Sequence, residues 1–418
     1  MSERIPFRRR SAPPDRASAF ARKSGSPLDI LLIFLRLGCF CFGGPISHLG
    51  YFRTEFVTRR KWLTEQAYAD LVALSQFLPG PASSQVGFGV GLMRGGLPGG
   101  LSAWIGFTAP SAALMVFVAY GASGVADAPL GAGLLHGLKL VAVAVVAQAV
   151  MGMAKSLCPD RERAAIATCA LIVMLLAPSS LFQIGVILAG GLAGLLLRPG
   201  ARRAAGEGFA TFVSRRLGLI CLVAYFALLA LAFMPLPPGP LALFGAFYRS
   251  GALVFGGGHV ALPLLREAVV APGWVSDGAF LAGYGAAQAA PGPLFAFAAY
   301  LGALAGVGPG GIAGAAIALA AIFLPGFLAL LGVLPFWRAL SARPAAQAAI
   351  SGANAAVVGL LGAALYDPVW TSAVRSSADF AVAATGFVLL AVWRAPPLLV
   401  VAFSALAGMT MGASGRVL

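Results

Sequence analysis

The chain has 418 residues, of which 59% are hydrophobic and 10% are charged, with a formal net charge of +15. A soluble domain carries roughly 25% charged residues, so too few polar residues remain here to cover a large soluble protein. Apolar runs of about 20 residues recur, and each is long enough to cross the hydrocarbon layer of a bilayer. The composition therefore predicts an all-α membrane protein with many segments, and its basic charge does not indicate nucleic-acid binding.

The first 27 residues are rich in Arg, Ser and Pro, and we predict that they form a disordered cytosolic tail. The tail is not a cleavable signal peptide, because the apolar run after it contains Arg36 and lacks a small-residue cleavage site. Cytoplasmic loops of membrane proteins carry an excess of Lys and Arg. The basic stretches 53–61, 155–163 and 198–216 are therefore expected in the cytoplasm, together with the N-terminus.

Thirteen apolar segments follow the tail, in an order of six, one unpaired segment and six. They lie near 28–50, 67–95, 98–122, 132–154, 164–177, 181–197, 217–234, 241–262, 279–306, 309–336, 346–366, 378–393 and 397–413. We expect a first transporter half over 28–200, a linker containing the unpaired span over 201–240, and a second half over 241–415.

The two halves share motifs at a nearly constant distance. Arg36, Gly38, Phe42, Gly43 and Gly44 recur in the second half as Arg249, Gly251, Phe255, Gly256 and Gly257. Trp62, Gln76 and Pro79-Gly80-Pro81 recur, at an offset shorter by a single position, as Trp274, Gln288 and Pro291-Gly292-Pro293. The chain is therefore a duplicated unit. Interrupted apolar segments at corresponding positions of two halves are typical of the central site of a transporter.

The charges also predict how the segments cross. The tail and the stretch 53–61 flank segment 28–50, yet both are expected in the cytoplasm. Segment 28–50 would then turn back at its glycine pair, and 67–95 would turn back at Pro79-Gly80-Pro81, although thirteen complete spans remain the alternative. Non-helical backbone at membrane depth needs protein or a water-filled cavity around it.

The stretch 235–240 has no basic residue and is expected outside. After the unpaired span 217–234, the corresponding hairpins of the second half would enter the membrane from the outer face. We therefore expect two homologous six-segment halves in inverted orientation, with broken or re-entrant helices in each.

Arg36 and Arg249 are the first candidate site residues. A charge at bilayer depth costs roughly 3 kcal/mol on insertion scales, so each needs a partner or an aqueous cavity. The planar guanidinium suits oxyanions, and two such groups related by a pseudo-two-fold axis would make a central cationic site. Alternatively, each arginine reaches the interface or pairs with a carboxylate such as Glu55 or Glu267.

The glycine pairs Gly43-Gly44 and Gly256-Gly257 are the second candidates. Broken helices expose N–H groups at a positive dipole end, and such ends bind anions. The alternative is close packing of helices, for which small residues are also favoured.

Gln76 and Gln288 lie three residues before the two Pro-Gly-Pro breaks, which interrupt the helices. Each glutamine either donates to a substrate oxygen or satisfies backbone groups freed by the break. Ser83 and Ser84 follow the first break, with Gln85 after them, whereas apolar residues follow the second. We therefore give the first half more weight for substrate contact.

Four residues are candidates for coupling transport to an ion gradient. Glu55 and Glu267 lie just beyond the glycine turns, where they either carry protons or form interfacial pairs with the nearby Arg53 and Arg266. Lys139 lies inside an apolar segment near His136, and an intramembrane lysine is a functional hypothesis by default, although one near a helix end only reaches the interface.

His48 follows the first glycine turn and is the fourth coupling candidate, because histidine titrates near neutral pH. The chain has three His and five Cys without metal-ligand spacing, so we expect no metal site. We also found no phosphate-binding loop of an ATP-driven pump and no recognisable catalytic triad.

Several phrases in fixed order resemble the chromate ion transporter (CHR) family, in its long two-domain form. They are Phe-Gly-Gly-Pro at 42–45, Leu-Pro-Gly-Pro at 78–81, Val-Phe-Gly-Gly-Gly at 254–258, Ala-Pro-Gly-Pro at 290–293 and Asn-Ala-Ala-Val-Val-Gly-Leu at 354–360. The resemblance covers about residues 28–415. It implies a protein of the bacterial inner membrane that exports chromate and confers resistance to it, with inverted halves and sulfate as a competing or exchanged anion.

The resemblance implies no cofactor and an ion gradient as the energy source. A secondary transporter is the preferred interpretation, and duplicated broken segments favour it over a membrane enzyme or assembly protein acting on a lipid headgroup. A passive anion channel stays open as an alternative. The sequence leaves the oligomeric state open, with a homodimer as one option.

Overall fold

The computed structural model describes residues 25–41, 44–125, 129–177, 180–197, 213–254, 261–337, 339 and 343–413, and these contain helices and no strand. In the first half the helices are α1 (Pro27–Phe40), α2 (Gly44–Arg53), α3 (Glu65–Phe77), α4 (Ala82–Val125), α5 (Pro129–Leu157), α6 (Arg161–Leu176) and α7 (Ser180–Leu197), with a π-helical segment at Thr54–Arg59. The unpaired span is α8 (Arg215–Phe233). The order agrees with the segments expected from the sequence.

The second half repeats this series. Its helices are α9 (Pro240–Ala252), α10 (Ala261–Val269), α11 (Asp277–Ala289), α12 (Phe297–Leu304), α13 (Gly311–Val333), α15 (Pro344–Ala364), α16 (Thr371–Ala373), α17 (Ser377–Ala391) and α18 (Pro397–Ala413), with short 3-10 turns at Leu294–Ala296 and Leu334–Phe336 and a π-helical segment at Leu365–Trp370.

Equivalent helices begin in the same way. The Thr64 hydroxyl accepts a hydrogen bond from the Ala67 N–H at the start of α3. Ser276, its counterpart in the second half, accepts from the Ala279 N–H at the start of α11. A side-chain oxygen at this position satisfies an N–H that has no partner inside the helix. The duplication therefore extends to the residues that fix the helix boundaries.

Two helical hairpins of the first half begin and end at the same end of the molecule. The Gly25 N–H donates to the Arg94 carbonyl at 3.1 Å, and the guanidinium of Arg94 lies over the Trp62 ring. The chain therefore leaves this end through α1 and returns by residue 62, then leaves through α3 and returns by residue 94. We call this place, defined by Gly25, Trp62 and Arg94, the first end.

Helix α4 turns at the first end rather than continuing straight. Gly95 and Gly96 have non-helical backbone angles, with φ of +63° at Gly96, and Gly91 packs directly against the Gly99 carbonyl. The same turn separates α12 from α13, where Gly302 packs against Gly314. Only glycine lets two helices approach this closely, so both hairpins depend on glycine pairs.

The corresponding points of the second half lie at the opposite end. The Gly306 N–H donates to the Trp274 carbonyl at 3.0 Å, and Gly308 lies beside Gly239. The Tyr120 hydroxyl, near the far end of α4, lies next to Gly311. Because α4 runs away from the first end, the hairpins of the second half start from a second end, and the two halves are inverted.

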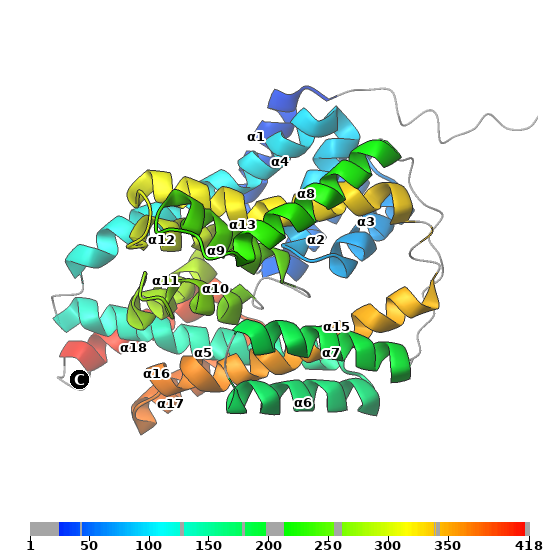
Figure 1. Cartoon of the computed structure of the whole chain (residues 1–418). Helices are drawn as coiled ribbons and strands as arrows, with labels where there is room; N and C mark the ends of the chain where they lie inside the picture. Colours follow the sequence, from blue (N-terminus) through cyan, green and yellow to red (C-terminus); the bar gives the residue numbers. More distant parts are fainter. Residues whose placement is uncertain are drawn as a thin grey trace, which may run out of the picture.

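The helices form two layers, and each layer draws on both halves (Figure 1). The upper layer in Figure 1 holds α1, α4, α8, α9, α12 and α13, and the lower holds α5 to α7 with α15 to α18. In the lower layer the partners are exchanged. Gly137 of α5 packs against Ser404 of α18, and Gly352 of α15 packs against Gly190 and Gly194 of α7. Each half therefore completes its packing with the last helices of the other.

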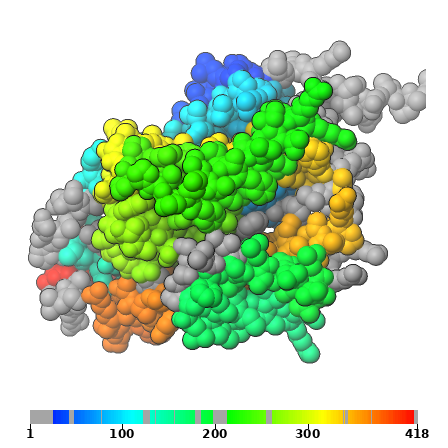
Figure 2. Space-filling model, in the orientation of Figure 1, coloured from blue at the N-terminus to red at the C-terminus, as the bar shows by residue number. Residues whose placement is uncertain are grey.

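Five helical stretches in the described part of the chain are long and apolar enough to cross a membrane. They are Ala82–Gly121, Leu130–Lys155, Arg215–Phe233, Gly311–Phe336 and Pro344–Ala373. Shorter apolar helices, among them Gly185–Leu197, Ser377–Ala391 and Pro397–Ala413, lie between them. Figure 2 shows α8 (green) across the outer surface of the upper layer, where Ile220 and Phe226 are exposed. An exposed apolar face of this kind suits contact with lipid.

Candidate substrate-binding site

The two Pro-Gly-Pro breaks meet the interrupted helices of the opposite half. The Gly80 N–H donates to the Val254 carbonyl just beyond α9 at 2.7 Å, and the Gly292 N–H donates to the Cys41 carbonyl just beyond α1 at 2.8 Å. These two bonds are equivalent under the duplication. They bring four helix interruptions together inside the upper layer, which is the placement expected of a transporter's central site.

Both breaks require glycine. Gly80 and Gly292 have φ of +113° and +86°, a region that residues with a side chain rarely adopt. A methyl group at Gly80 would come within 2.8 Å of the Gly326 Cα, and one at Gly292 would come within 2.9 Å of the Ser111 hydroxyl oxygen. The backbone of each break is therefore pressed against the long helix of the other half.

Gln85 holds the first break in place. Its side chain is fully buried, and its amide Nε2 donates to the Pro79 carbonyl at 2.8 Å and to the Gly326 carbonyl at 2.9 Å. Buried carbonyl groups freed by a helix break need such donors. The sequence suggested this role for Gln76, but Gln76 is exposed at the end of α3. The signal for Gln85 was its place in the polar run after the break.

A buried polar cluster lies against the start of α4. It centres on His48 and Ser83, and the buried residues Ser84 and Thr108 directly follow Ser83 and Phe107 along the chain; none of the four is more than 4% exposed. The His48 Nδ1 lies 3.4 Å from the Ser83 hydroxyl, and the His48 ring packs edge-on against Phe107 at 5.1 Å between centroids. We call these four residues the His48 cluster. The first turn of α4 adds backbone N–H groups that have no partner inside the helix.

Several polar atoms of this cluster have no hydrogen-bond partner among the described residues. They are Ser84 Oγ and Thr108 Oγ1, together with the Oε1 of the neighbouring Gln85, whereas the His48 imidazole also interacts with the Cys41 backbone. Buried polar side chains in proteins nearly always find a partner. Hydroxyl donors, an imidazole and a helix N-terminus are all groups that can bind an anion.

The two arginines predicted to form a central cationic site lie apart from this cluster. Arg36 is exposed on α1, on the same face as Leu32 and Phe40. Arg249 is half-buried, with its guanidinium 5.6 Å from the centre of the Phe233 ring and near enough to Glu267 to feel its charge. Neither makes a hydrogen bond to the His48 cluster within the described residues.

The other predicted binding residues have mixed placements. Gly44 is the first residue of α2. Gln288 is half-buried at the end of α11, interacts with the Tyr284 hydroxyl, and leaves its Nε2 without a partner in the part of the chain described. Gly43, Gly256 and Gly257 lie outside the described residues.

The predicted pairing of Glu55 with Arg53 is wrong. Glu55 accepts from Arg59 at 3.1 Å and from Arg60 at 2.5 Å, because the π-helical segment places both arginines on its side. Burial raises the pKa of Glu55, but the two guanidiniums outweigh burial and hold this pKa below its ordinary value. Arg53 pairs with Glu65 instead.

The second half repeats the ion pair formed by Arg53. A further contact, which the sequence did not reveal, joins the two halves. Arg266 pairs with Asp277 at 2.9 Å, so the predicted pairing of Glu267 with Arg266 is also wrong. Glu267 lies near enough to Arg249 for their charges to interact. Across the two halves, the His136 Nε2 lies 2.7 Å from the Asp379 carboxylate. Lys139 is half-buried one turn further along α5, beside Gly278. The His136–Asp379 contact joins residues 243 apart, a distance at which sequence spacing carries no signal.

The sequence profile named "Chromate transporter" matches residues 28–195 and 241–409, one match in each half. The chain belongs to the chromate transporter family. It is a multi-pass membrane transport protein rather than an enzyme, as the family resemblance implied. The two matched regions contain both helix breaks and the whole His48 cluster.

Named relatives cover most of the chain. The "Chromate transport protein" of Pseudomonas aeruginosa is 30% identical over 367 residues, which cover 86% of each chain. The "Chromate transport protein" of Cupriavidus metallidurans is 25% identical and covers 87% of this chain and 86% of its own. The "Probable chromate transport protein" of Synechococcus elongatus is 28% identical, with 79% and 82% covered. No solved structure matches the chain.

Proposed function

We propose that this transporter moves chromate out of the cytoplasm and confers chromate resistance, with the His48 cluster as its binding site. The observation that carries this proposal is the set of unpaired buried donors beside the first helix break. The choice of chromate as the anion rests on the names of the relatives. Chromate is a tetrahedral dianion, and so is sulfate, which should therefore compete for the site or exchange across it.

The distribution of charge supports the direction of insertion. Lys155, Arg161, Arg215 and Arg343 belong to the first end, where Arg94 also lies, because their helices begin or finish there. Cytoplasmic loops carry an excess of Lys and Arg, so we propose that the first end lies on the cytoplasmic side of a bacterial inner membrane. The two hairpins, α1 with α2 and α3 with the first part of α4, then open towards the cytoplasm. The N-terminus lies on the same side.

We place ion coupling at His48. Its imidazole contacts Ser83 and belongs to the cluster that would hold the anion. Protonation would add a positive charge beside a dianion, so the binding of the proton and the binding of the anion would be linked. Glu55 and Glu267 are weaker coupling candidates because each interacts with an arginine.

The deciding experiment is uptake of radiolabelled chromate into everted membrane vesicles, with and without a proton-gradient uncoupler and with sulfate present. We expect accumulation against the gradient that the uncoupler abolishes and sulfate reduces. Downhill flux that ignores the uncoupler would contradict coupling and favour a passive anion channel. Absence of chromate flux would contradict the proposed substrate.

A further inference from the structure

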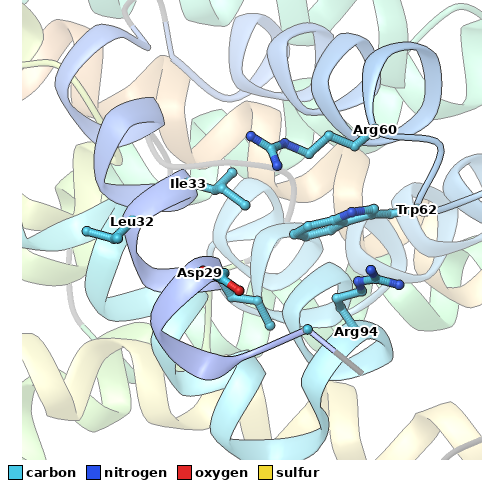
Figure 3. A pocket seen from close by; sticks show the side chains of 8 residues that line it. Asp29, Leu32, Ile33, Arg60, Trp62 and Arg94 are labelled. Atoms are coloured by element: carbon cyan, nitrogen blue, oxygen red, sulfur yellow. The ribbon is translucent and has the colours of Figure 1, made fainter. Parts of the chain in front are cut away.

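A pocket of about 350 Å³ opens at the first end, where α1 begins (Figure 3). Its lining includes Asp29, Leu32, Ile33, Arg60, Trp62 and Arg94. Its volume falls within the range of small-ligand sites. The pocket is separate from the His48 cluster, and none of its residues takes part in the site proposed above for chromate.

One side of the pocket carries two guanidinium groups around an aromatic ring. Arg60 lies 5.7 Å and Arg94 5.1 Å from the centre of the Trp62 ring, and Figure 3 shows the ring between them. Arg60 is also held by Glu55 at 2.5 Å. The buried Nε of Arg94 has no hydrogen-bond partner among the residues described. Arg94 therefore lines the pocket with its guanidinium oriented by the ring, and its positive charge can attract an oxyanion.

The pocket also contains a carboxylate, that of Asp29, which forms no ion pair with Arg94 among the residues described. Asp29 lines the same pocket from the first turn of α1, and no ion pair joins it to any arginine in the described chain. A simple anion would be attracted by Arg94 and repelled by Asp29. A ligand that carries a phosphate and an ammonium group on one short linker would satisfy both.

The surroundings of the pocket are those of a membrane interface. Trp and Arg side chains are frequent at the headgroup level of bilayers. Helix α1 exposes Leu32, which lines the pocket, at 54% and Leu35, about one turn further along, at 38%; the two lie on one face of the helix. This apolar stripe could accompany an acyl chain into the membrane.

We propose that this pocket binds a phospholipid with a primary ammonium headgroup, of the phosphatidylethanolamine type. The phosphate lies against Arg94, the ammonium group lies against Asp29, and an acyl chain follows Leu32 and Leu35. Arg60, on the other side of the Trp62 ring, adds positive charge to the pocket without contacting the phosphate. The phosphate chemistry is shared with free inorganic phosphate, so the experiment must separate the two sources.

The test is native mass spectrometry of the purified full chain in detergent with phosphatidylethanolamine, phosphatidylcholine or phosphatidylglycerol of matched acyl chains. We expect phosphatidylethanolamine to be retained about fivefold more than phosphatidylcholine, whose quaternary amine has no N–H for Asp29. Asp29→Asn should abolish this preference and leave phosphatidylglycerol retention undiminished. Arg94→Gln and Arg60→Gln should each reduce retention about fivefold, since one basic residue near a membrane contributes about that factor.

Arg59→Gln is the matched control. Arg59 also bonds to Glu55, at 3.1 Å, but it does not line the pocket, so lipid retention should be unchanged. Arg94→Lys, checked for a single monodisperse species, provides a second variant if Arg94→Gln does not fold, and it should retain less lipid than the native chain.

Three results would overturn the proposal. Equal retention of phosphatidylethanolamine and phosphatidylcholine, or a preference that survives Asp29→Asn, would remove the ammonium contact. Displacement of the lipid by millimolar inorganic phosphate would make the pocket a site for free oxyanions. An equal loss in Arg59→Gln would show attraction by general surface charge. None of these readouts depends on chromate transport.

Discussion

The Ser84 hydroxyl is 3% exposed and has no hydrogen-bond partner among the described residues. Removing it should cost almost no folding stability, because no protein hydrogen bond is lost. Removing a hydrogen bond to a charged ligand costs about 1.5–3 kcal/mol. We expect Ser84→Ala to raise the chromate concentration for half-maximal flux by roughly tenfold to a hundredfold, with an unfolding temperature within about 2 °C of the native one.

Ser250→Ala is the control for this prediction. Ser250 is equally buried, but its hydroxyl already donates to the Ala246 carbonyl at 2.9 Å. Its removal should lower stability slightly and leave the half-maximal concentration unchanged. Unchanged flux in Ser84→Ala would place the substrate elsewhere.

Arg36 and Arg249 remain a prediction of the sequence, because the structure places neither against the His48 cluster. Each lies about one turn before an interrupted helix end, so its positive charge can act on an anion at the breaks without contact. We expect Arg36→Gln and Arg249→Gln each to abolish chromate flux in membranes that contain normal amounts of protein. Lysine at either position should restore part of the flux. Normal flux in both glutamine variants would remove the central cationic site.

Among the structural elements, we expect the helix breaks to tolerate substitution least. Gly80→Ala adds a methyl group against the Gly326 Cα and forces a residue with a side chain to φ of +113°. We expect a loss of about 1–3 kcal/mol in stability and a larger loss of chromate flux, measured by thermal unfolding in detergent and vesicle uptake. Gly273→Ala is the control, since its φ is +78° with no atom nearby. The Gly273→Ala variant should lose stability through backbone strain alone and should transport chromate at the native rate.

The exchanged helices provide a second prediction at this scale. The Gly137 position on α5 packs directly on the Ser404 carbonyl, whereas Gly152 on the same helix has no atom within 4 Å of where a side chain would begin. Gly137→Val should separate α5 from α18 and prevent a stable, monodisperse protein from being purified. Gly152→Val should purify normally. Size-exclusion chromatography decides the comparison, and normal behaviour of Gly137→Val would contradict the packing.

Over the whole molecule, the hairpins predict which loops share a side of the membrane. Lys61 lies in an exposed loop between α2 and α3, and Ala271 lies in the equivalent loop of the second half. In a cysteine-free background, a cysteine at Lys61 should react with a membrane-impermeant maleimide from the cytoplasmic side, and one at Ala271 from the outside. Complete spans in place of hairpins would reverse both results.

The sequence was sufficient for the duplication, the unpaired span, the breaks and the inversion, because these depend on local motifs and on the positions of Lys and Arg. It did not reveal that Gln85 rather than Gln76 satisfies the break, since Gln85 needs the Gly326 carbonyl from the other half. Nor did it reveal the His136–Asp379 contact or the exchanged helices. These features depend on which surfaces of distant helices meet, and no periodicity within one helix contains that information.

The exchange of helices also determines when, during translation, helix α5 can complete its packing. Gly137 on α5 precedes Gly408, one of its packing partners on α18, by well over half the length of the chain. At roughly 5–20 residues per second, a ribosome needs about 15–50 s to add that length. During this time the glycine face of α5 has no partner from its own chain. Cells that translate this protein must therefore keep an unfinished helix surface in the membrane until the last two helices are inserted, and degradation by membrane proteases should be greatest in that interval.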